Sequence, residues 1–333
     1  MLQQTQVSTV IPYFHRFIST FPSLEALAQA PLSAVLGQWS GLGYYARARN
    51  LHRCAQTLLT SHSGQFPQNA AALAELPGIG RSTAAAIAAF VWQERAAILD
   101  GNVRRVLCRY FAITGHPGEA AVQQRLWAIA ESLLPDSAHM PAYTQALMDL
   151  GALCCTRQQP CCATCPLQSD CLAHAQGLQK SLPTPRKRPP LPERSALCFL
   201  LAQGDHWLLE TRPPSGIWGG LLAPLLIEYP PDALPKNGPE TLIKTLADRG
   251  IHLSGPLVPR PVLTHTFTHF RLHLHPWEAE VQHAPDGLFT PLAKHALDNA
   301  PLPTPIRTLL SHTQQTRHTQ QTRHTRESGY PAP

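Results

Sequence analysis

The sequence has no uninterrupted apolar run near the roughly 18 residues that a membrane span requires. Its first residues also lack the positive charge that opens a signal peptide, and Gln3, Gln4 and Gln6 interrupt any apolar stretch there. These two absences argue against a membrane-spanning protein and against an ordinary secreted one. We therefore expect a cytoplasmic protein without a membrane segment.

Charged residues are scarce at 14% of the 333 residues, and 27 Lys and Arg against 21 Asp and Glu give a formal net charge of +6. This small excess permits a nucleic-acid partner without requiring one, because part of it lies in a proline-rich linker and in a polar tail. Hydrophobic residues make up 44% of the chain, which is enough to fill real cores. The length favours two domains, on a prior of roughly 150 residues per domain.

Residues 1–175 place apolar side chains at helical spacing between prolines, which predicts a mostly helical first domain. The apolar stripe of its first helix consists of Val7, Val10, Ile11, Phe14 and Ile18. No capping residue precedes this helix, so we expect it to run from Met1, as if the chain began in mid-helix.

Residues 176–195 combine prolines with basic side chains, a composition typical of an extended linker. Residues 196–311 predict a domain of mixed α and β structure. Its clearest elements are three strands and one helix, at Ala196–Ala202, His206–Glu210, Phe270–His275 and Glu240–Ala247. Residues 312–333 contain a repeat of HTQQTR with nothing apolar to bury, which predicts a disordered tail.

Six of the nine cysteines fall between residues 154 and 171 of a chain without a secretion signal, which favours a metal site over disulfides. Zinc sites usually pair two short cysteine hooks, whereas this segment has one, from Cys162 to Cys165. Four thiolates around an iron-sulfur cluster are therefore favoured over zinc. Cys154 adjoins Cys155, and Cys161 adjoins Cys162. From spacing alone, either member of each pair could be a ligand.

The segment Leu76–Ala84 reads LPGIGRSTA, with Gly78 and Gly80 in a tight turn ahead of a helix of small residues. Backbone N–H groups at such a turn can bind a DNA phosphate, which holds position without reading sequence. A plain corner between two helices explains the same residues equally well.

Asp100 lies twenty residues beyond Gly80 in the segment ILDGNVRRV, where it alone is typical of a helix N-cap. Hairpin and aspartate together resemble the helix-hairpin-helix glycosylase superfamily, in which an aspartate at this place is catalytic. The capping role and the chemical role are compatible.

Within that superfamily the chain is similar to the adenine DNA glycosylase (MutY) family, up to about residue 310. The family's segments occur in order, as MLQQTQV at 1–7, GLGYYARARN at 41–50, the hairpin, ILDGNV and the cysteines. The resemblance implies a mostly α N-terminal domain, of the helix-hairpin-helix glycosylase type with an iron-sulfur cluster loop, and an α+β Nudix-like C-terminal domain. It also selects the ligands of a 4Fe-4S cluster, namely Cys155, Cys162, Cys165 and Cys171.

The resemblance further implies a base-excision repair enzyme that hydrolyses the N-glycosidic bond of adenine paired with 8-oxoguanine or guanine in double-stranded DNA. The base must leave its stack before that bond can be reached. Gln4 and Tyr44 would enter the duplex and hold the opposite lesion, and the enzyme would act as a monomer at the bacterial nucleoid. The expected DNA contacts are Gln3, Gln4, Gly78, Gly80, Ser82, Phe267, Thr268 and His269.

Adenine departs well only when it is protonated, and a nearby negative charge stabilises the cationic sugar that develops. By resemblance Asp100 supplies the negative charge, with Asn102 and Tyr44 beside it in the catalytic site. The family's proton donor is a glutamate two residues ahead of the methionine that is Met1 here, and the first acidic residue of this sequence is Glu25. We expect a DNA binder with little glycosylase activity, from either a start assigned too late or a true truncation.

Ser82 occupies the position at which lyase-active relatives carry a Schiff-base lysine, so the resemblance favours simple hydrolysis over strand cleavage. Three interpretations stay open. They are an adenine glycosylase, a lesion-binding protein without catalysis, and a related glycosylase or lyase with another substrate.

The segments RPPSGIWGG at 212–220 and HTFTHF at 265–270 resemble the family's C-terminal domain, which is related to Nudix hydrolases. Diphosphate hydrolysis would need a glutamate-rich magnesium helix, and only TLIKTL follows Glu240. By resemblance Phe267, Thr268 and His269 form the loop that contacts 8-oxoguanine, and Thr268 adds a methyl group where the family commonly has serine. The alternative is a hydrophobic strand end with Phe267 and Phe270 in the core.

Overall fold

The computed structural model describes residues 1–186, 189–229 and 238–313, and it divides into two compact units. Met1–His52 and the residues from Pro190 onward form one, here called the sheet unit, and Arg53–Pro189 form the other, here called the helical unit. None of the described helices is long and apolar enough to cross a membrane.

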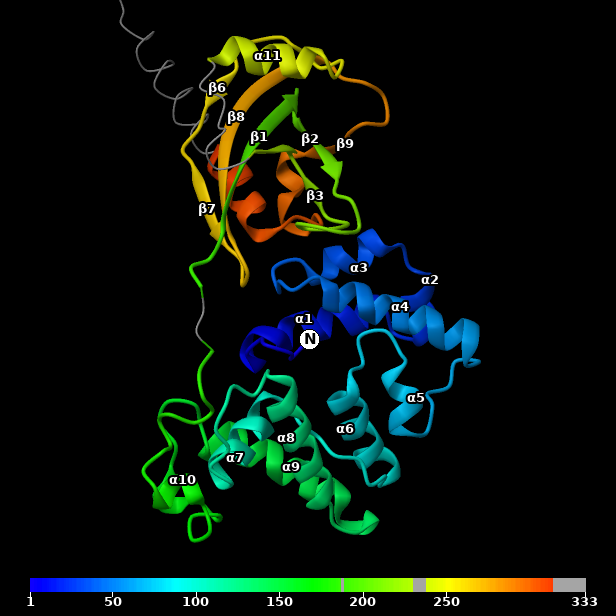
Figure 1. Ribbon diagram of the computed structural model, residues 1–333. Coiled ribbons are helices and arrows are strands. Elements are labelled where there is room, and N and C mark those ends of the chain that lie inside the picture. Colours follow the sequence, from blue (N-terminus) through cyan, green and yellow to red (C-terminus); the bar gives the residue numbers. More distant parts are fainter. Residues whose placement is uncertain (187–188, 230–237, 314–333) are drawn as a thin grey trace, which may run out of the picture. The chain divides into compact units, whose positions relative to one another are not determined.

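The helical unit is built from helices around a small core (Figure 1). Its elements are α4 (Ala46–Ser61, which begins in the sheet unit), α5 (Ala70–Ala74), α6 (Arg81–Trp92), α7 (Gly101–Tyr110), α8 (Ala120–Ser132), η1 (Ser137–His139), α9 (Met140–Asp149), η2 (Leu150–Cys154), η3 (Cys162–Thr164) and α10 (Leu172–Ala175). Its core joins the extended segment Ala97–Leu99 to the inner faces of α7 and α8, through Val103, Leu107 and Leu126. The residues that precede Asp100 are therefore buried and fixed.

The sheet unit opens with three helices, α1 (Val7–Thr20), α2 (Leu24–Gln29) and α3 (Leu32–Trp39). Phe17 and Trp39 pack edge to face, with ring centroids 6.0 Å apart, and join α1 to α3. Ser23 caps α2, since its side chain accepts a hydrogen bond from the Ala26 backbone N–H at 3.1 Å.

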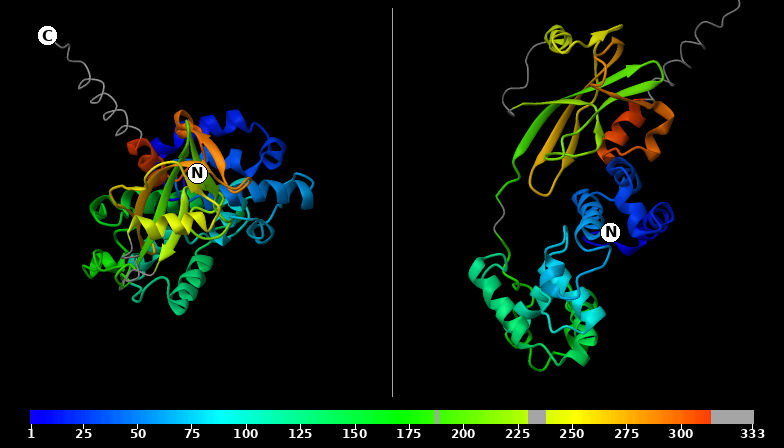
Figure 2. Two further views of the ribbon diagram at one scale, coloured as in Figure 1. Left: turned by 90° about the horizontal axis from the view of Figure 1, so that it is seen from above. Right: turned by 90° about the vertical axis from the view of Figure 1, so that its right-hand side faces the viewer.

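The rest of the sheet unit is a twisted sheet with helices on two sides (Figures 1 and 2). Its strands are β1 (Glu193–Gln203), β2 (His206–Thr211), β3 (Leu222–Ala223), β4 (Leu225–Tyr229), β5 (His252–Leu253), β6 (Val258–Pro259), β7 (Leu263–Thr266), β8 (Arg271–His283) and β9 (Thr290–Ala293). The central strand β1 runs parallel to β8 and antiparallel to β2 and β4. The helical elements are α11 (Pro239–Ala247), η5 (Lys294–Asn299) and a final helix at residues 304–313.

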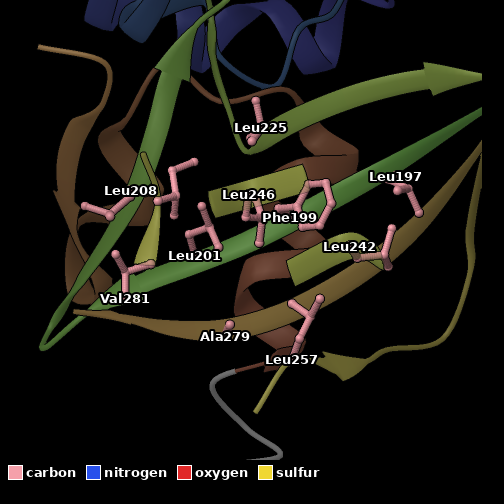
Figure 3. Packing of buried hydrophobic residues seen from close by; sticks show 11 residues of the cluster. Leu197, Phe199, Leu201, Leu208, Leu225, Leu242, Leu246, Leu257, Ala279 and Val281 are labelled. Carbon is pink, nitrogen blue, oxygen red and sulfur yellow. The ribbon is translucent and has the colours of Figure 1, made fainter. Parts of the chain in front are cut away.

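One face of this sheet buries alternate residues of β1 under α11 (Figure 3). Leu197, Phe199 and Leu201 point to the same side, because side chains alternate along a strand, and they meet Leu242 and Leu246 of α11. This core supports β1 and β8 from the side of α11 and thereby fixes the ends of β7 and β8, where the loop 267–270 begins.

The three strands and the helix expected in the second half all form, so the expected mixture of α and β structure is confirmed. The expectation that the first helix runs from Met1 is wrong, since α1 begins at Val7. Gln4 has a left-handed backbone with φ of 59°, and Gln6 is extended, so neither continues a helix. The final helix reaches Thr313, two residues past the expected domain boundary, and the rest of the predicted tail lies outside the described residues.

Candidate functional site

Asp100 stands at the start of α7 with its side chain exposed. Its Oδ1 accepts hydrogen bonds from the backbone N–H groups of Asn102, at 3.0 Å, and Val103, at 2.8 Å. This is the geometry of an N-cap, in which the carboxylate satisfies two N–H groups at the positive end of the helix. Both hydrogen bonds use the same oxygen, so the carboxylate is held in place while Oδ2 takes part in neither.

Ser82 fixes the segment that leads into Asp100. Its hydroxyl oxygen accepts a hydrogen bond from the Leu99 backbone N–H at 2.9 Å. Leu99 itself is only 1% exposed, so the residue before Asp100 is held by packing and by this hydrogen bond. Ser82 thus links the first turn of α6 to the first turn of α7.

Asn102 and Arg105 connect α7 to the start of the cysteine segment. The Arg105 guanidinium donates to Asn102 Oδ1 at 3.0 Å, to the Gly151 carbonyl at 2.5 Å and to the Cys155 carbonyl at 2.7 Å. Gly151 is pressed against Asn102, because a Cβ on Gly151 would lie 2.7 Å from the Asn102 Cβ. Asn102 is therefore positioned by its neighbours, two residues from Asp100.

The hairpin forms at residues 76–80, between α5 and α6. Gly78 has φ of 82°, a conformation that glycine adopts without strain, and Gly80 is the N-cap residue of α6. No side chain caps α6, and a Cβ placed on Gly80 would meet nothing within 4 Å. The first N–H groups of α6 therefore lie at an open helix end, where a phosphate can approach the backbone.

The predicted cluster ligands surround one small cavity in the helical unit. Cys155, Cys162, Cys165 and Cys171 all line it, together with Cys154, whereas Cys161 is exposed and does not. Burial raises the pKa of Cys162, and the nearby charges of Cys155, Cys171 and Cys165 raise it further. The four predicted thiols therefore lie within electrostatic reach of one another.

The cysteines are gathered without reaching the geometry of a metal site. Among the residues that the structure describes, no three His, Cys, Asp or Glu side chains converge closely enough to hold a metal ion. The donor set still fits an iron-sulfur cluster, because four thiols line one cavity and an arginine donates to one of them.

That arginine is Arg109, which is 3% exposed. Its guanidinium donates to Cys155 Sγ at 3.3 Å and to the carbonyls of Thr156 at 2.6 Å, Arg157 at 3.0 Å and Leu182 at 3.0 Å. One buried side chain thus holds both ends of the segment that carries the cysteines.

In the sheet unit, Arg47 contacts the two segments that carry Gln4 and Tyr44, the residues predicted to enter the duplex. It donates to the carbonyls of Met1 at 2.5 Å and Gln3 at 2.6 Å, and to Gly43 at 3.2 Å. Its guanidinium carbon also lies 5.6 Å from the centre of the Tyr44 ring. The segment that carries Gln3 and Gln4 is therefore anchored beside the turn that carries Tyr44.

Gln4 and Tyr44 share two properties that suit residues entering a duplex. Both have left-handed backbones, with φ of 59° and 48°, and both are exposed. Tyr44 is 51% exposed, so its ring is not part of a hydrophobic core. Non-glycine residues adopt this conformation at a cost, and such residues cluster at functional sites.

The loop 267–270 faces a cavity of about 570 Å³ that Tyr44 also lines. The Phe267 N–H donates to the Phe270 carbonyl at 2.8 Å, which leaves Thr268 and His269 exposed at the tip. Phe270 is buried and stacks on Phe267 with ring centroids 4.5 Å apart. The core interpretation thus holds for Phe270, while the tip is free to touch a ligand.

The ring of Trp218 packs against this loop at Phe267. Its ring centroid lies 5.9 Å from that of Phe267, and its backbone is left-handed with φ of 56°. The next residue must be glycine, because a Cβ on Gly219 would lie 2.3 Å from the Pro214 carbonyl oxygen. Arg49 donates to the Gly219 carbonyl at 2.8 Å and so ties this turn to the segment of Tyr44.

The predicted site residues thus fall into two groups. The helical unit brings together Asp100, Asn102, Ser82 and the hairpin, and separately the four cysteines; the sheet unit brings together Gln3, Gln4, Tyr44 and the loop 267–270. The motif analysis missed Arg47, Arg105, Arg109 and Trp218. The only sequence signal for any of them is the spacing of Arg105 and Arg109, which are four residues apart and therefore lie on one face of α7.

We expect Arg47→Lys to loosen the two segments that carry Gln4 and Tyr44. A lysine side chain cannot replace a guanidinium that donates hydrogen bonds to backbone carbonyls of both segments. The variant should lose about 1–3 kcal/mol of unfolding free energy. Hydrogen exchange, measured by mass spectrometry, should accelerate at residues 1–5 and 41–45. Arg249→Lys, at an exposed arginine two residues after the end of α11, is the matched control, and equal acceleration in both variants would contradict this role for Arg47.

The helices with their hairpin and the sheet correspond to two family models. The family model described as "HhH-GPD superfamily base excision DNA repair protein" matches residues 1–132, and the one described as "NUDIX domain" matches residues 196–312. The fold class expected from the sequence is confirmed.

Curated relatives make the assignment narrower. The chain is 41% identical over 219 residues to the adenine DNA glycosylase of Buchnera aphidicola subsp. Baizongia pistaciae, covering 66% of this chain and 62% of that protein. It is 35% identical over 276 residues to that of Buchnera aphidicola subsp. Acyrthosiphon pisum, covering 83% and 76%. A thermostable thymine-DNA glycosylase of known structure is similar at 27% identity and a TM-score of 0.47, over 53% of this chain and 80% of that one.

The chain therefore belongs to the adenine DNA glycosylase family, whose members are DNA N-glycosylases of base excision repair. It spans 62% and 76% of the lengths of the two bacterial relatives.

Proposed function

We propose that this protein removes adenine from double-stranded DNA where the adenine is paired with 8-oxoguanine or guanine, by hydrolysis of the N-glycosidic bond. The observation that carries the proposal is the carboxylate of Asp100. It is exposed at the end of a buried segment, and two backbone hydrogen bonds hold one of its oxygens. The second oxygen can then face the sugar of a base that has left the stack.

Asp100 would act by electrostatic stabilisation. Loss of adenine leaves positive charge on the sugar, and a carboxylate already fixed in place stabilises that charge without having to reorganise. Asn102, held by Arg105, would position the flipped nucleotide, and water would complete the hydrolysis.

Protonation of adenine is the step that needs a second acid. The family resemblance assigns it to a glutamate ahead of Met1. Helix α1 contains no acidic residue, and the first one in the sequence is Glu25, in α2.

The other strand would be read by the sheet unit. Tyr44 lines the same cavity as the loop 267–270, Gln4 is exposed, and a flat aromatic face beside hydrogen-bonding groups suits a purine. Thr268 and His269 lie at the loop's tip, with Thr268 Oγ1 and His269 Nδ1 3.3 Å apart. The Thr268 hydroxyl keeps the hydrogen bond that a serine would make with 8-oxoguanine.

The proposal includes a 4Fe-4S cluster bound by Cys155, Cys162, Cys165 and Cys171. When bound, such a cluster joins distant parts of a loop through metal-thiolate bonds. Arg109 and Arg105 would keep the first ligand, Cys155, in register with α7, because both donate to its carbonyl. The protein would act as a monomer on chromosomal DNA in the bacterial cytoplasm.

Single-turnover excision on three duplexes tests this function, with adenine opposite 8-oxoguanine, guanine or thymine. We expect a protein extended to include the glutamate to excise adenine from the first two duplexes, to leave the third intact and to cut no strand until base is added. A polypeptide that lacks this glutamate should bind the same duplexes and react about 10²- to 10⁴-fold more slowly, because the general acid is missing.

Equal rates on all three duplexes would contradict the lesion-reading role. Excision at full rate by residues 1–333 would contradict the assignment of the proton donor. Preferential binding without excision by either polypeptide would support the alternative of a lesion-binding protein without catalysis, which the absence of acidic residues from α1 favours.

A further inference from the structure

His265 lies in β7, just ahead of the loop 267–270, and its ring lines the same cavity of about 570 Å³ as that loop. β7 pairs with β8, and His265 lies opposite Leu272 in that pairing, so its backbone is held by the sheet (Figure 1). Its side chain is partly buried. A ring placed on a fixed strand at the wall of this cavity can act on the loop that follows it.

Three aromatic rings contact one another at this wall of the cavity. The His265 and Phe267 rings meet edge to face, with centroids 4.6 Å apart and an angle of 90° between their planes. The Trp218 ring lies 6.4 Å from the His265 ring and 5.9 Å from the Phe267 ring. Aromatic pairs favour such separations and prefer edge-to-face contact to flat stacking. His265 and Trp218 thus hold the first aromatic ring of the loop.

Packing orients the His265 ring, because no hydrogen bond or ion pair involves it in the part of the chain that the structure describes. Burial lowers the pKa of His265, so the imidazole is uncharged at neutral pH. An uncharged ring lies beside Trp218 and Phe267 at a smaller desolvation cost than an imidazolium would. What His265 supplies to the loop is therefore a flat ring, independent of its nitrogens.

The Phe267 ring is restrained in two directions. It stacks on Phe270 with centroids 4.5 Å apart and 25° between the planes, whereas the His265 ring meets it at 90°. Phe270 is buried, and its carbonyl accepts a hydrogen bond from the Phe267 N–H at 2.8 Å. A ring held between one nearly parallel and one perpendicular neighbour cannot turn without losing a contact. The exposed residue that follows, Thr268, takes its position from this ring.

We propose that His265 is a positioning residue for recognition of the base opposite the adenine. Its ring holds Phe267 so that Thr268 and His269 meet 8-oxoguanine in one orientation. A tip that is already ordered loses less conformational entropy when it binds than a mobile one does. This inference rests on the proposed function, in which the loop 267–270 contacts that base.

Two substitutions separate the ring of His265 from its nitrogens. His265→Phe keeps an aromatic ring beside Phe267, and His265→Asn keeps a polar group without the ring. His275→Asn is the matched control, because His275 is a partly buried histidine of β8 whose pKa is also lowered by burial. It lies three residues from Leu272, the partner of His265, and therefore on the opposite face of the sheet.

Binding of the full chain is measured on three duplexes that carry a 2′-fluorinated adenosine, which resists excision, opposite 8-oxoguanine, guanine or thymine. We expect the preference for 8-oxoguanine over guanine, given by the ratio of dissociation constants, to fall about 3- to 10-fold in His265→Asn. This is the effect of losing about one aromatic pair. His265→Phe and His275→Asn should change the ratio less than about twofold. Affinity for the thymine duplex should stay within about twofold of the parent, because contacts with the DNA backbone do not read the base.

Hydrogen exchange of the protein without DNA supplies a second measurement. The Phe267 amide closes the loop through its hydrogen bond to the Phe270 carbonyl. It should exchange faster in His265→Asn, because local opening exposes it to solvent, and at the parent rate in His265→Phe and His275→Asn.

An unchanged ratio in His265→Asn, or equal falls in His265→Asn and His265→Phe, would overturn the proposal. The second result would assign the effect to the nitrogens. Weaker binding of His265→Asn to all three duplexes alike would overturn it as well, because it would reveal a general loss of stability. Failure of the proposed function would appear differently, as equal affinity of the parent for all three duplexes. Hydrogen exchange would then still decide whether the His265 ring holds the loop, and equal rates in all four proteins would show that it does not.

Discussion

Replacing Asp100 with asparagine should lower the rate of adenine excision about 10²- to 10³-fold while leaving the fold intact. Asparagine caps helices as well as aspartate does, so the hydrogen bonds to the N–H groups of Asn102 and Val103 survive. Only the negative charge that stabilises the cationic sugar is lost. The measurement is single-turnover excision opposite 8-oxoguanine, in the protein that includes the glutamate ahead of Met1.

Asp136→Asn is the matched control for this variant. Asp136 is also an exposed N-cap of the helical unit, and its Oδ1 accepts a hydrogen bond from the His139 N–H at 3.2 Å. Both variants should change the free energy of unfolding by less than about 1 kcal/mol. If Asp100→Asn retained the parent rate, or if Asp136→Asn lost as much activity, the role given to the Asp100 charge would be wrong.

Short motifs explain why the chemistry could be predicted from the sequence. The turn at Gly78 and Gly80 and the cap at Asp100 depend on residues close by in the chain, and the structure forms both turn and cap where they were expected. The strands of the second half could also be predicted from the local sequence, because the alternating burial along β8 follows from its alternating side chains. Local signals therefore predicted the hairpin turn and the helix cap, whereas the site roles of the residues came from the family resemblance.

Hydrogen bonds between arginines and backbone carbonyls that lie far apart in the sequence could not be predicted in the same way. Arg47 contacts the carbonyls of Met1 and Gln3, and Arg109 contacts Leu182, 73 residues away. Backbone carbonyls occur at every residue, so no pattern in the sequence marks the ones that an arginine will reach. The residues that position the site were missed for this reason, although the residues placed in the site itself were named.

The first helix shows a different limit. Its apolar stripe correctly indicated a helix, but the boundary coincides with the left-handed backbone of Gln4 and with the hydrogen bond from Arg47 to the Gln3 carbonyl. Glutamine has no strong preference for a left-handed conformation. The start of α1 was therefore set by a tertiary contact and could not be read from local propensity.

Replacing Cys165 with serine should abolish the iron-sulfur cluster, because it lines the cavity that the four predicted ligands share. Loss of one thiolate leaves three ligands, and the loops that meet there would lose their common attachment. We expect iron content and visible absorbance to fall to background. The melting temperature should fall with them, since cluster binding stabilises only the folded loop.

Three further serine variants test which cysteines are ligands. Cys161 is exposed and lies outside the cavity, so Cys161→Ser should keep its full iron content. Cys154 lines the same cavity as Cys155, but only Cys155 receives a hydrogen bond from Arg109, at 3.3 Å from its sulfur. Such a donor stabilises a thiolate, and Cys155→Ser should therefore lose the iron while Cys154→Ser retains it. The reverse result would move the first ligand to Cys154, and iron bound equally in all four variants would refute the cluster altogether.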